Sequence, residues 1–308
     1  MLDKKDEIIM EALMHNARIE VKELAKLTNL TKPTIVYRIE QLEKQGFISK
    51  YDAIINYSKF ELYKEFIFLN VSNRLKPDFL KLLDERKEIC SCFETLSNQN
   101  FVLLGFYKTK KQKEDFHKLL KKFSPLVNFY EISNIRFKPY SVFNLNLKFK
   151  EEKVDDKIIK LDKTDIKLIK TLSDGNARKS ILELSELVGE KYDKLLYRFK
   201  KLKKSNYFPI FFAQPSTTKF HIQNDFLIIN TNNNNLKIYD NLKEISQIPY
   251  FCELNDKKLL LQILTKNFEE FKSTLAKIKE KIDEFSTIEV YNTHKTHLLN
   301  RYPLEWLV

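Results

Sequence analysis

The sequence is poor in glycine, with only 4 glycines among 308 residues. It contains no glycine-rich phosphate-binding loop and no G-x-S-x-G turn, which speaks against the common nucleotide-binding and serine-hydrolase enzymes. The pair His294 and His297 lacks the glutamate and the spacing of a zinc-protease helix. We therefore predict no catalytic residue, no metal site and no cofactor, and a protein that is not an enzyme.

Cysteines and long apolar runs are also scarce. The 3 cysteines, Cys90, Cys92 and Cys252, fit the reducing cytoplasm better than a secreted protein. No run of about 18 apolar residues is long enough to span a membrane, and the charged N-terminus lacks the apolar core of a secretory signal. These absences predict a cytoplasmic protein without a membrane partner.

Positive charge is abundant. Lys and Arg total 54 against 42 Asp and Glu, which gives a formal net charge of +12. This balance favours a polyanionic partner such as DNA. An AT-rich genome, which enriches lysine and asparagine, would produce the same excess.

Residues 27–48 predict the turn and second helix of a winged helix-turn-helix. Thr31 is a good N-cap, and Pro33 falls in the first turn, where its missing amide costs nothing. An apolar stripe follows, formed by Ile35, Ile39 and Leu42. The side chains off this stripe suit the major groove of double-stranded DNA; they are Lys32, Thr34, Tyr37, Arg38 and Gln41. An ordinary amphipathic helix with a solvated face is the alternative.

The residues before this stretch extend the pattern. Leu2-Asp3-x-x-Asp6 leads into a short apolar-faced helix, which Asn16-Ala17-Arg18 closes, and Glu23-Leu24-Ala25 lies in a second helix. With residues 31–48, this order resembles the N-terminal domain of the Lrp/AsnC (feast/famine) family of transcription regulators. The resemblance covers residues 2–48 and implies a sequence-specific DNA-binding regulator.

The second half of the chain repeats the first. Leu161-Asp162-x-x-Asp165 repeats the opening motif, and Asn176-Ala177-Arg178 repeats the tripeptide at residues 16–18. The apolar stripe returns as Leu195, Phe199 and Leu202. A register without gaps from residue 16 to about residue 48 is hard to obtain by chance. The sequence therefore predicts two family-like halves fused in tandem.

Each half continues with strands and helices in the order β-α-β-β-α-β of a ferredoxin-like domain, the assembly and effector domain that the resemblance implies. The predicted fold class is α+β, with two winged helix-turn-helix domains alternating with two ferredoxin-like domains. The expected ranges are 1–60, 61–150, 151–220 and 221–308. Residues 47–56 are expected to form the wing and an outgoing strand, residues 137–149 a strand that pairs with another copy, and residues 150–159 a charged linker.

The second recognition helix differs from the first. Lys191 replaces the capping Thr31, and the helix is heavily basic, which suits phosphates more than bases. Its candidate DNA contacts are Lys191, Lys194, Arg198 and Lys201. Arg38 and Arg198 have an equally weighted structural interpretation, in which each pairs with a carboxylate of the preceding first helix, Asp6 or Asp165.

The family's amino-acid effector lies near a G-x-x-D turn between the second and third strands. Here the corresponding turns are 97–100 and 255–258, and neither contains the glycine. Asn98, Gln99 and Asn100 stay as candidate ligand-binding residues, with a plain solvent-exposed turn as the alternative. We therefore do not expect a free amino acid as effector.

Two other functions resemble this architecture. Siroheme decarboxylases resemble paired or fused Lrp/AsnC chains, but their Q-x-x-F-P segment is replaced by residues 15–18, and their histidine motif has no match between Cys90 and Tyr107. A structural partner of other family members that has lost DNA contact is the third alternative. We favour the regulator, and we expect its two halves to pack on each other as an internal pseudo-dimer, which would cover unpaired sheet edges. Self-association of whole chains into a homo-oligomer is left open.

Overall fold

The computed structural model describes residues 2–143, 145, 147, 155, 157–230, 235–255, 257–282, 287–298 and 306. The chain forms two compact units, one from residues 1–59 and 137–222 and the other from residues 60–136 and 223–307. Each unit therefore combines matching segments of the two halves. The division into four consecutive domains stays a prediction. Most of the expected linker, residues 150–154 and 156, lies outside the described residues.

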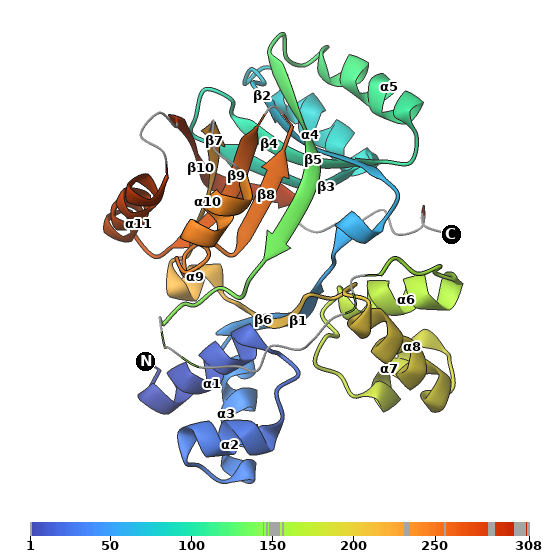
Figure 1. Ribbon diagram of the computed structural model, residues 1–308, viewed down its shortest axis with the longest axis vertical. Coiled ribbons are helices and arrows are strands. Elements are labelled where there is room, and N and C mark those ends of the chain that lie inside the picture. The colour runs from blue at the N-terminus through green and yellow to red at the C-terminus, as the bar shows by residue number, and fades with distance from the viewer. Residues whose placement is uncertain are drawn as a thin grey trace. The chain divides into compact units, whose positions relative to one another are not determined.

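The first unit contains two clusters of three helices (Figure 1). The first cluster consists of α1 (Lys4–His15), α2 (Val21–Thr28) and α3 (Lys32–Lys44), and the second of α6 (Lys163–Leu172), α7 (Ile181–Val188) and α8 (Tyr192–Lys204). The repeated L-D-x-x-D motif caps both first helices. The Asp3 carboxylate accepts hydrogen bonds from the amides of Lys5 and Asp6, each 2.8 Å long, and Asp162 does the same in α6.

A two-stranded ladder joins the two clusters. Strand β1 (Ile48–Ile54) pairs antiparallel with β6 (Ile210–Pro215), so the strand that follows each recognition helix finds its partner in the other half. The 3-10 turn η1 (Tyr57–Lys59) follows β1, and the short helix α9 (Thr217–Phe220) follows β6. The expected wing at residues 47–56 is thus one strand of a ladder shared between halves.

The second unit contains the strands and helices of both ferredoxin-like segments. The first segment consists of β2 (Tyr63–Leu69), α4 (Lys76–Glu85), β3 (Ile89–Thr95), β4 (Phe101–Tyr107), α5 (Lys110–Leu120) and β5 (Val127–Phe137). The second consists of β7 (Gln223–Asn230), α10 (Asn235–Leu242), β8 (Tyr250–Leu254), β9 (Lys258–Thr265), α11 (Phe268–Lys281) and β10 (Thr287–Leu298). Both follow the predicted β-α-β-β-α-β order.

The two sheets close into one barrel in the order β10-β3-β4-β2-β5-β8-β9-β7. Strand β10 makes one of the junctions, because its first part pairs with β7 and its last part pairs with β3 of the first half. At the other junction, the Asn255 amide donates to the Glu131 carbonyl over 2.9 Å. The last strand, Thr287–Leu298, is therefore shared between the two sheets.

Aromatic side chains of both halves meet inside the barrel. Phe66 lies near Phe226 and Tyr250, with ring centroids 6.4 and 6.3 Å away, and Phe68 lies 4.6 Å from Tyr291. On the outside, α4 and α5 cover one apolar cluster, and α10 and α11 cover a second (Figure 1). The aromatic contacts inside the barrel bury apolar surface of both halves, and this burial holds the two halves together.

The expected strand at residues 137–149 is wrong over the residues that the structure describes. Strand β5 ends at Phe137, and residues 138–143, 145 and 147 form no strand. The apolar residues of this segment pack instead within the first unit, where Tyr140 and Val142 are buried. Their burial within the chain accounts for part of the apolar character of this segment.

Candidate nucleic-acid interface

Local sequence signals place helix α3 as expected. The Thr31 hydroxyl caps the helix by accepting a hydrogen bond from the Thr34 amide over 3.4 Å, and Pro33 lies in the first turn. The stripe of Ile35, Ile39 and Leu42 is buried. After the helix, Gly46 adopts a φ of +70°, a left-handed conformation that glycine reaches at little cost.

The predicted contact face of α3 divides into exposed and half-buried side chains. Lys32 and Tyr37 are exposed, and Tyr37 retains 60% of its accessible surface. Thr34 and Gln41 are half-buried, and the Thr34 hydroxyl also lies 2.8 Å from the Thr31 hydroxyl. Val36, which we did not single out from the sequence, is exposed beside them. The face therefore combines one cation, two small polar groups and an exposed aromatic ring.

Arg38 is half-buried and differs from the rest of this face because its guanidinium is held by two carboxylates. Its Nη1 atom donates to Asp3 over 2.8 Å and to Asp6 over 2.7 Å, so the guanidinium ties α3 to the start of α1. The hydrogen bonds that Arg38 donates, first to Asp3 and then to Asp6, raise the pKa of Arg38. Arg198 repeats this arrangement with Asp162 and Asp165 over 2.7 and 2.8 Å. These contacts agree with the structural interpretation of both arginines.

Helix α8 has the same buried stripe and a weaker start. Lys191 occupies the N-cap position without a side-chain cap hydrogen bond, and Asn206 adopts the left-handed conformation of Gly46 with a φ of 60°. Leu195, Phe199 and Leu202 are buried, while Lys191 and Lys194 are exposed and Lys201 is half-buried. The structure thus leaves the predicted lysines accessible.

Comparison of the two clusters reveals a reversal of charge. The first turn of α3 has no acidic residue, whereas that of α8 contains Asp193. On the preceding helix, the exposed Lys26 becomes the exposed Glu186, and at the start of the recognition helix Lys32 becomes Tyr192. The last turn of α8 concentrates its positive charge at Lys201, Lys203 and Lys204. An alignment of the two repeats would have revealed this difference from the sequence.

The polar turn at residues 97–100 is built into the barrel. The Asn100 side chain accepts from the Val71 amide and donates to the Val71 carbonyl, each over 2.8 Å. Gln99 donates to the Phe68 carbonyl over 3.3 Å and accepts from the Tyr291 hydroxyl over 2.9 Å. Asn98 is exposed. The amides of Gln99 and Asn100 therefore have structural partners within the chain, and the assignment of residues 98–100 as ligand-binding groups stays a prediction.

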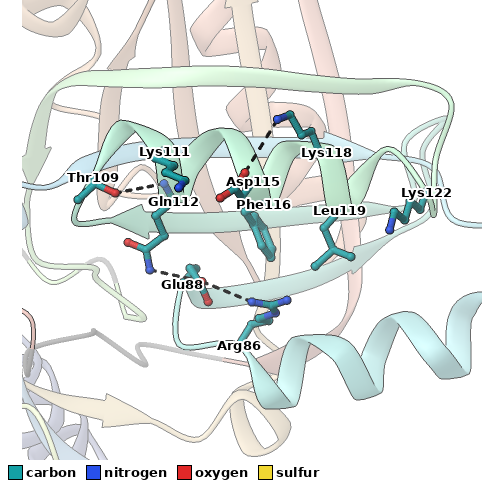
Figure 2. Close-up of a pocket in the computed structure, with 10 residues that line it drawn as sticks. All are labelled: Arg86, Glu88, Thr109, Lys111, Gln112, Asp115, Phe116, Lys118, Leu119 and Lys122. Carbon is teal, nitrogen blue, oxygen red and sulfur yellow. Dashed lines mark hydrogen bonds and ion pairs between the residues drawn. The ribbon is translucent and has the colours of Figure 1, made fainter.

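A groove of about 520 Å³ lies along α5 (Figure 2). Phe116 and Leu119 of α5 point toward Arg86 and Glu88, which precede β3. The Gln112 amide lies 3.4 Å from the Glu88 carboxylate, and Arg86 lies 3.8 Å from it. The rest of the lining is mixed in charge and consists of Thr109, Lys111, Asp115, Lys118 and Lys122. Sequence reasoning did not identify this groove.

In the described part of the chain, no group of three or more His, Cys, Asp or Glu side chains is arranged to hold a metal ion. No helix in that part is both long and apolar enough to cross a bilayer.

Comparisons with known proteins agree with the helix-turn-helix geometry. A family model described as winged helix-turn-helix DNA-binding matches residues 2–49. An uncharacterised HTH-type transcriptional regulator of Pyrococcus abyssi is 30% identical over 125 residues, which make up 39% of this chain and 81% of the relative. The HTH-type transcriptional regulator FL11 of Pyrococcus furiosus is 28% identical over 117 residues, covering 38% of this chain and 78% of the relative.

A solved structure matches the chain along its whole length. The siroheme decarboxylase NirDL superposes with a TM-score of 0.65, and the match covers 98% of this chain and 97% of that one. The sequence identity is only 9%, so the likeness concerns the fold. It shows that this tandem order of domains occurs in another protein.

Fold, repeat and matched segment together define a tandem winged helix-turn-helix protein of the transcriptional-regulator class. The chain belongs to the Lrp/AsnC family of transcription regulators, with two family-like halves in one polypeptide.

Proposed function

We propose that the chain is a sequence-specific regulator that binds double-stranded DNA and reads bases mainly with α3. The observation that carries this proposal is the first turn of α3, which has Lys32 and no acidic residue. In helix-turn-helix proteins, the N-terminal residues of the recognition helix contact base edges. The contacts that we assign to base recognition are made by Lys32, Thr34, Tyr37 and Gln41.

Helix α8 has a different proposed role. Asp193 lies in its first turn and Glu190 directly precedes its N-cap, and both would be repelled by the walls of the major groove. Lysines fit phosphates as point charges that position a protein without reading sequence. We therefore assign phosphate contacts to Lys191, Lys194 and Lys201.

One chain then presents both helices to a single, asymmetric DNA site. The shared β1–β6 ladder and the common barrel support an internal pseudo-dimer. No small-molecule effector is part of this proposal, because the turn at residues 97–100 uses its amides internally.

Selection of bound sequences from a random duplex pool, followed by footprinting, tests the proposal. We expect one strongly enriched half-site and a weakly defined second contact about one DNA turn, ~34 Å, away. A pool that shows no enrichment would refute sequence-specific binding. A perfectly palindromic footprint would refute the asymmetric assignment.

The full-length match to NirDL supports a second candidate, a siroheme-decarboxylase-like enzyme. Protein ligands of haem-type iron are His, Cys, Met and Tyr side chains, and none of the 10 residues that line the α5 groove is of these types. The groove therefore offers no axial ligand for the iron of such a tetrapyrrole. A Soret band after addition of siroheme or haem would favour the enzyme over the regulator.

A further inference from the structure

The repeated Asn-Ala-Arg segments bind each other's half. The Ala17 amide donates to the Phe211 carbonyl on β6 over 2.8 Å, and the Ala177 amide donates to the Tyr51 carbonyl on β1 over 3.0 Å. Each segment thus docks on the strand of the opposite half. Since these contacts are reciprocal, they form a local two-fold arrangement within the first unit.

The two arginines extend this arrangement. Arg18 Nη1 donates to the carbonyls of Ala177 and Lys179 over 2.6 and 2.9 Å. In return, Arg178 Nη1 donates to the Ala17 carbonyl. A planar guanidinium can hold two acceptors in fixed directions, which a lysine ammonium cannot do as rigidly.

Arg18 also contacts the recognition helix of the other half directly, and Arg178 reaches the other one through Tyr51 of β1. The Arg18 guanidinium lies 4.8 Å from the ring centre of Phe199 on α8. The Arg178 guanidinium lies 5.6 Å from the ring centre of Tyr51, whose hydroxyl donates to Glu43 of α3 over 2.5 Å. In cation–π contacts of this kind, the cation is attracted to the electron-rich face of the ring. The arginines therefore couple the two recognition helices through specific contacts.

The arrangement costs free energy as well as supplying it. Both guanidiniums are half-buried; burial lowers the pKa of Arg18, and the nearby charge of Arg178 lowers it further. Two like charges held close together are a costly way to secure a fold, and apolar side chains would fill the same space more cheaply. A role in fixing the geometry of the two helix clusters explains why two half-buried arginines lie here, whereas a role in stability alone does not.

We propose that Arg18 and Arg178 are positioning residues that fix the spacing and orientation of α3 relative to α8, and so determine which separation of DNA contacts the protein accepts. This inference rests on the proposed function for its DNA consequence, but its geometric part does not depend on DNA.

The DNA experiment uses the selected duplex with 5 base pairs inserted between the two contact regions, which rotates one region by about half a turn. The insertion should weaken binding of the wild-type protein at least tenfold, or ~1.4 kcal/mol. R18A and R178A together should remove most of this preference. A purely structural role would lower affinity for both duplexes alike and keep the ratio, which would overturn the proposal.

Two further variants make the comparison specific. R18K keeps the charge but not the rigid two-carbonyl fork, and it should lose part of the spacing preference. K179A removes a charge from the same segment while leaving the carbonyl that accepts from Arg18, and it should keep the wild-type ratio. If K179A also loses the spacing preference, the effect depends on charge in this segment, and the positioning role of Arg18 and Arg178 is contradicted.

A DNA-independent measurement separates this inference from the proposed function. Spin labels at E40C and K200C, exposed positions on α3 and α8, report the distance between the helices; the three native cysteines are buried and should not react. The wild-type background should give one narrow distance distribution and the R18K background a broader or shifted one. If R18K leaves the distance distribution unchanged, the positioning role of Arg18 and Arg178 is overturned. This outcome does not depend on whether the protein selects any DNA sequence.

Discussion

The guanidinium of Arg38 lies between two carboxylates of α1, and this position predicts how substitutions there combine. R38A should destabilise the first helix cluster by about 1 kcal/mol, because exposed and half-exposed ion pairs contribute at that level. D6A should have a similar effect, and the double variant should cost less than the sum of the two. Urea unfolding of the four proteins measures the coupling.

DNA binding distinguishes the two interpretations of this arginine. If Arg38 serves only to hold α3 on α1, R38A and D6A should change DNA affinity equally under conditions in which both are folded. A large loss of affinity confined to R38A would show that the guanidinium also contacts DNA.

Asn100 predicts a second effect of a single residue. N100A leaves the amide and the carbonyl of the buried Val71 without their partners, and each buried unpaired group costs about 1–3 kcal/mol. The variant should therefore lower the free energy of unfolding by that amount or more. N98A, at the exposed neighbour, is the matched control and should have little effect. An equal effect of both substitutions would contradict the structural role.

Among the elements, α3 and α8 should respond differently to substitution. Replacing Thr34 and Gln41 by alanine should relax sequence preference, since a good base contact is worth about 1–3 kcal/mol of discrimination. Replacing Lys191, Lys194 and Lys201 by alanine should weaken binding to all duplexes alike and flatten the salt dependence. Binding to selected and scrambled duplexes at several salt concentrations measures both. Equal loss of preference from the two sets would contradict the division of roles.

The junction of β3 and β10 should respond to pH. Glu94 of β3 lies 2.5 Å from Lys76 and 2.9 Å from His297 of β10. Burial alone would raise the pKa of Glu94, but the hydrogen bonds from Lys76 and His297 outweigh it, so the pKa is lowered. The stabilisation is complete above the unfolded pKa of about 4.3 and is lost as the pH falls through the lower folded pKa.

Unfolding by urea between about pH 6 and pH 3 measures this dependence. E94Q should lower stability at neutral pH and flatten the decline toward acid. E114Q, at an exposed carboxylate of α5, is the control and should retain the wild-type slope. A steep decline that persists in E94Q would assign the acid sensitivity to other groups.

The elements also show how far the sequence alone could lead. The caps at Asp3 and Asp162, the buried stripe of α3 and the strand order were predictable, because each depends on residues close together in the chain. The strand partners were not predictable. Because the two halves are similar, β1 could pair within its own half or with β6, and the hydrophobic periodicity of the strand is the same in both cases. The polar residues from Asn292 to His297 concealed the second part of β10. For Arg38, the sequence could not decide between two acceptors of the guanidinium, a carboxylate of the protein and a phosphate of DNA.

At the scale of the whole molecule, the formal charge of +12 predicts a strong effect of salt. If binding occurs mainly through lysine and arginine, the logarithm of the affinity should fall linearly with the logarithm of salt concentration, by about 0.9 for each phosphate contact. Titrations of duplex DNA from low to moderate salt measure the slope. An affinity that barely changes would show that this positive charge does not face DNA.

The closed barrel has a consequence for how this chain assembles. Among the residues that the structure describes, the strands of the barrel form a closed ring without a free edge for a foreign strand to join, and aromatic side chains of the two halves contact each other inside it. Subunit exchange, by which related proteins form mixed assemblies, is therefore disfavoured. Each molecule therefore keeps the pair of helices, α3 and α8, that its own sequence encodes.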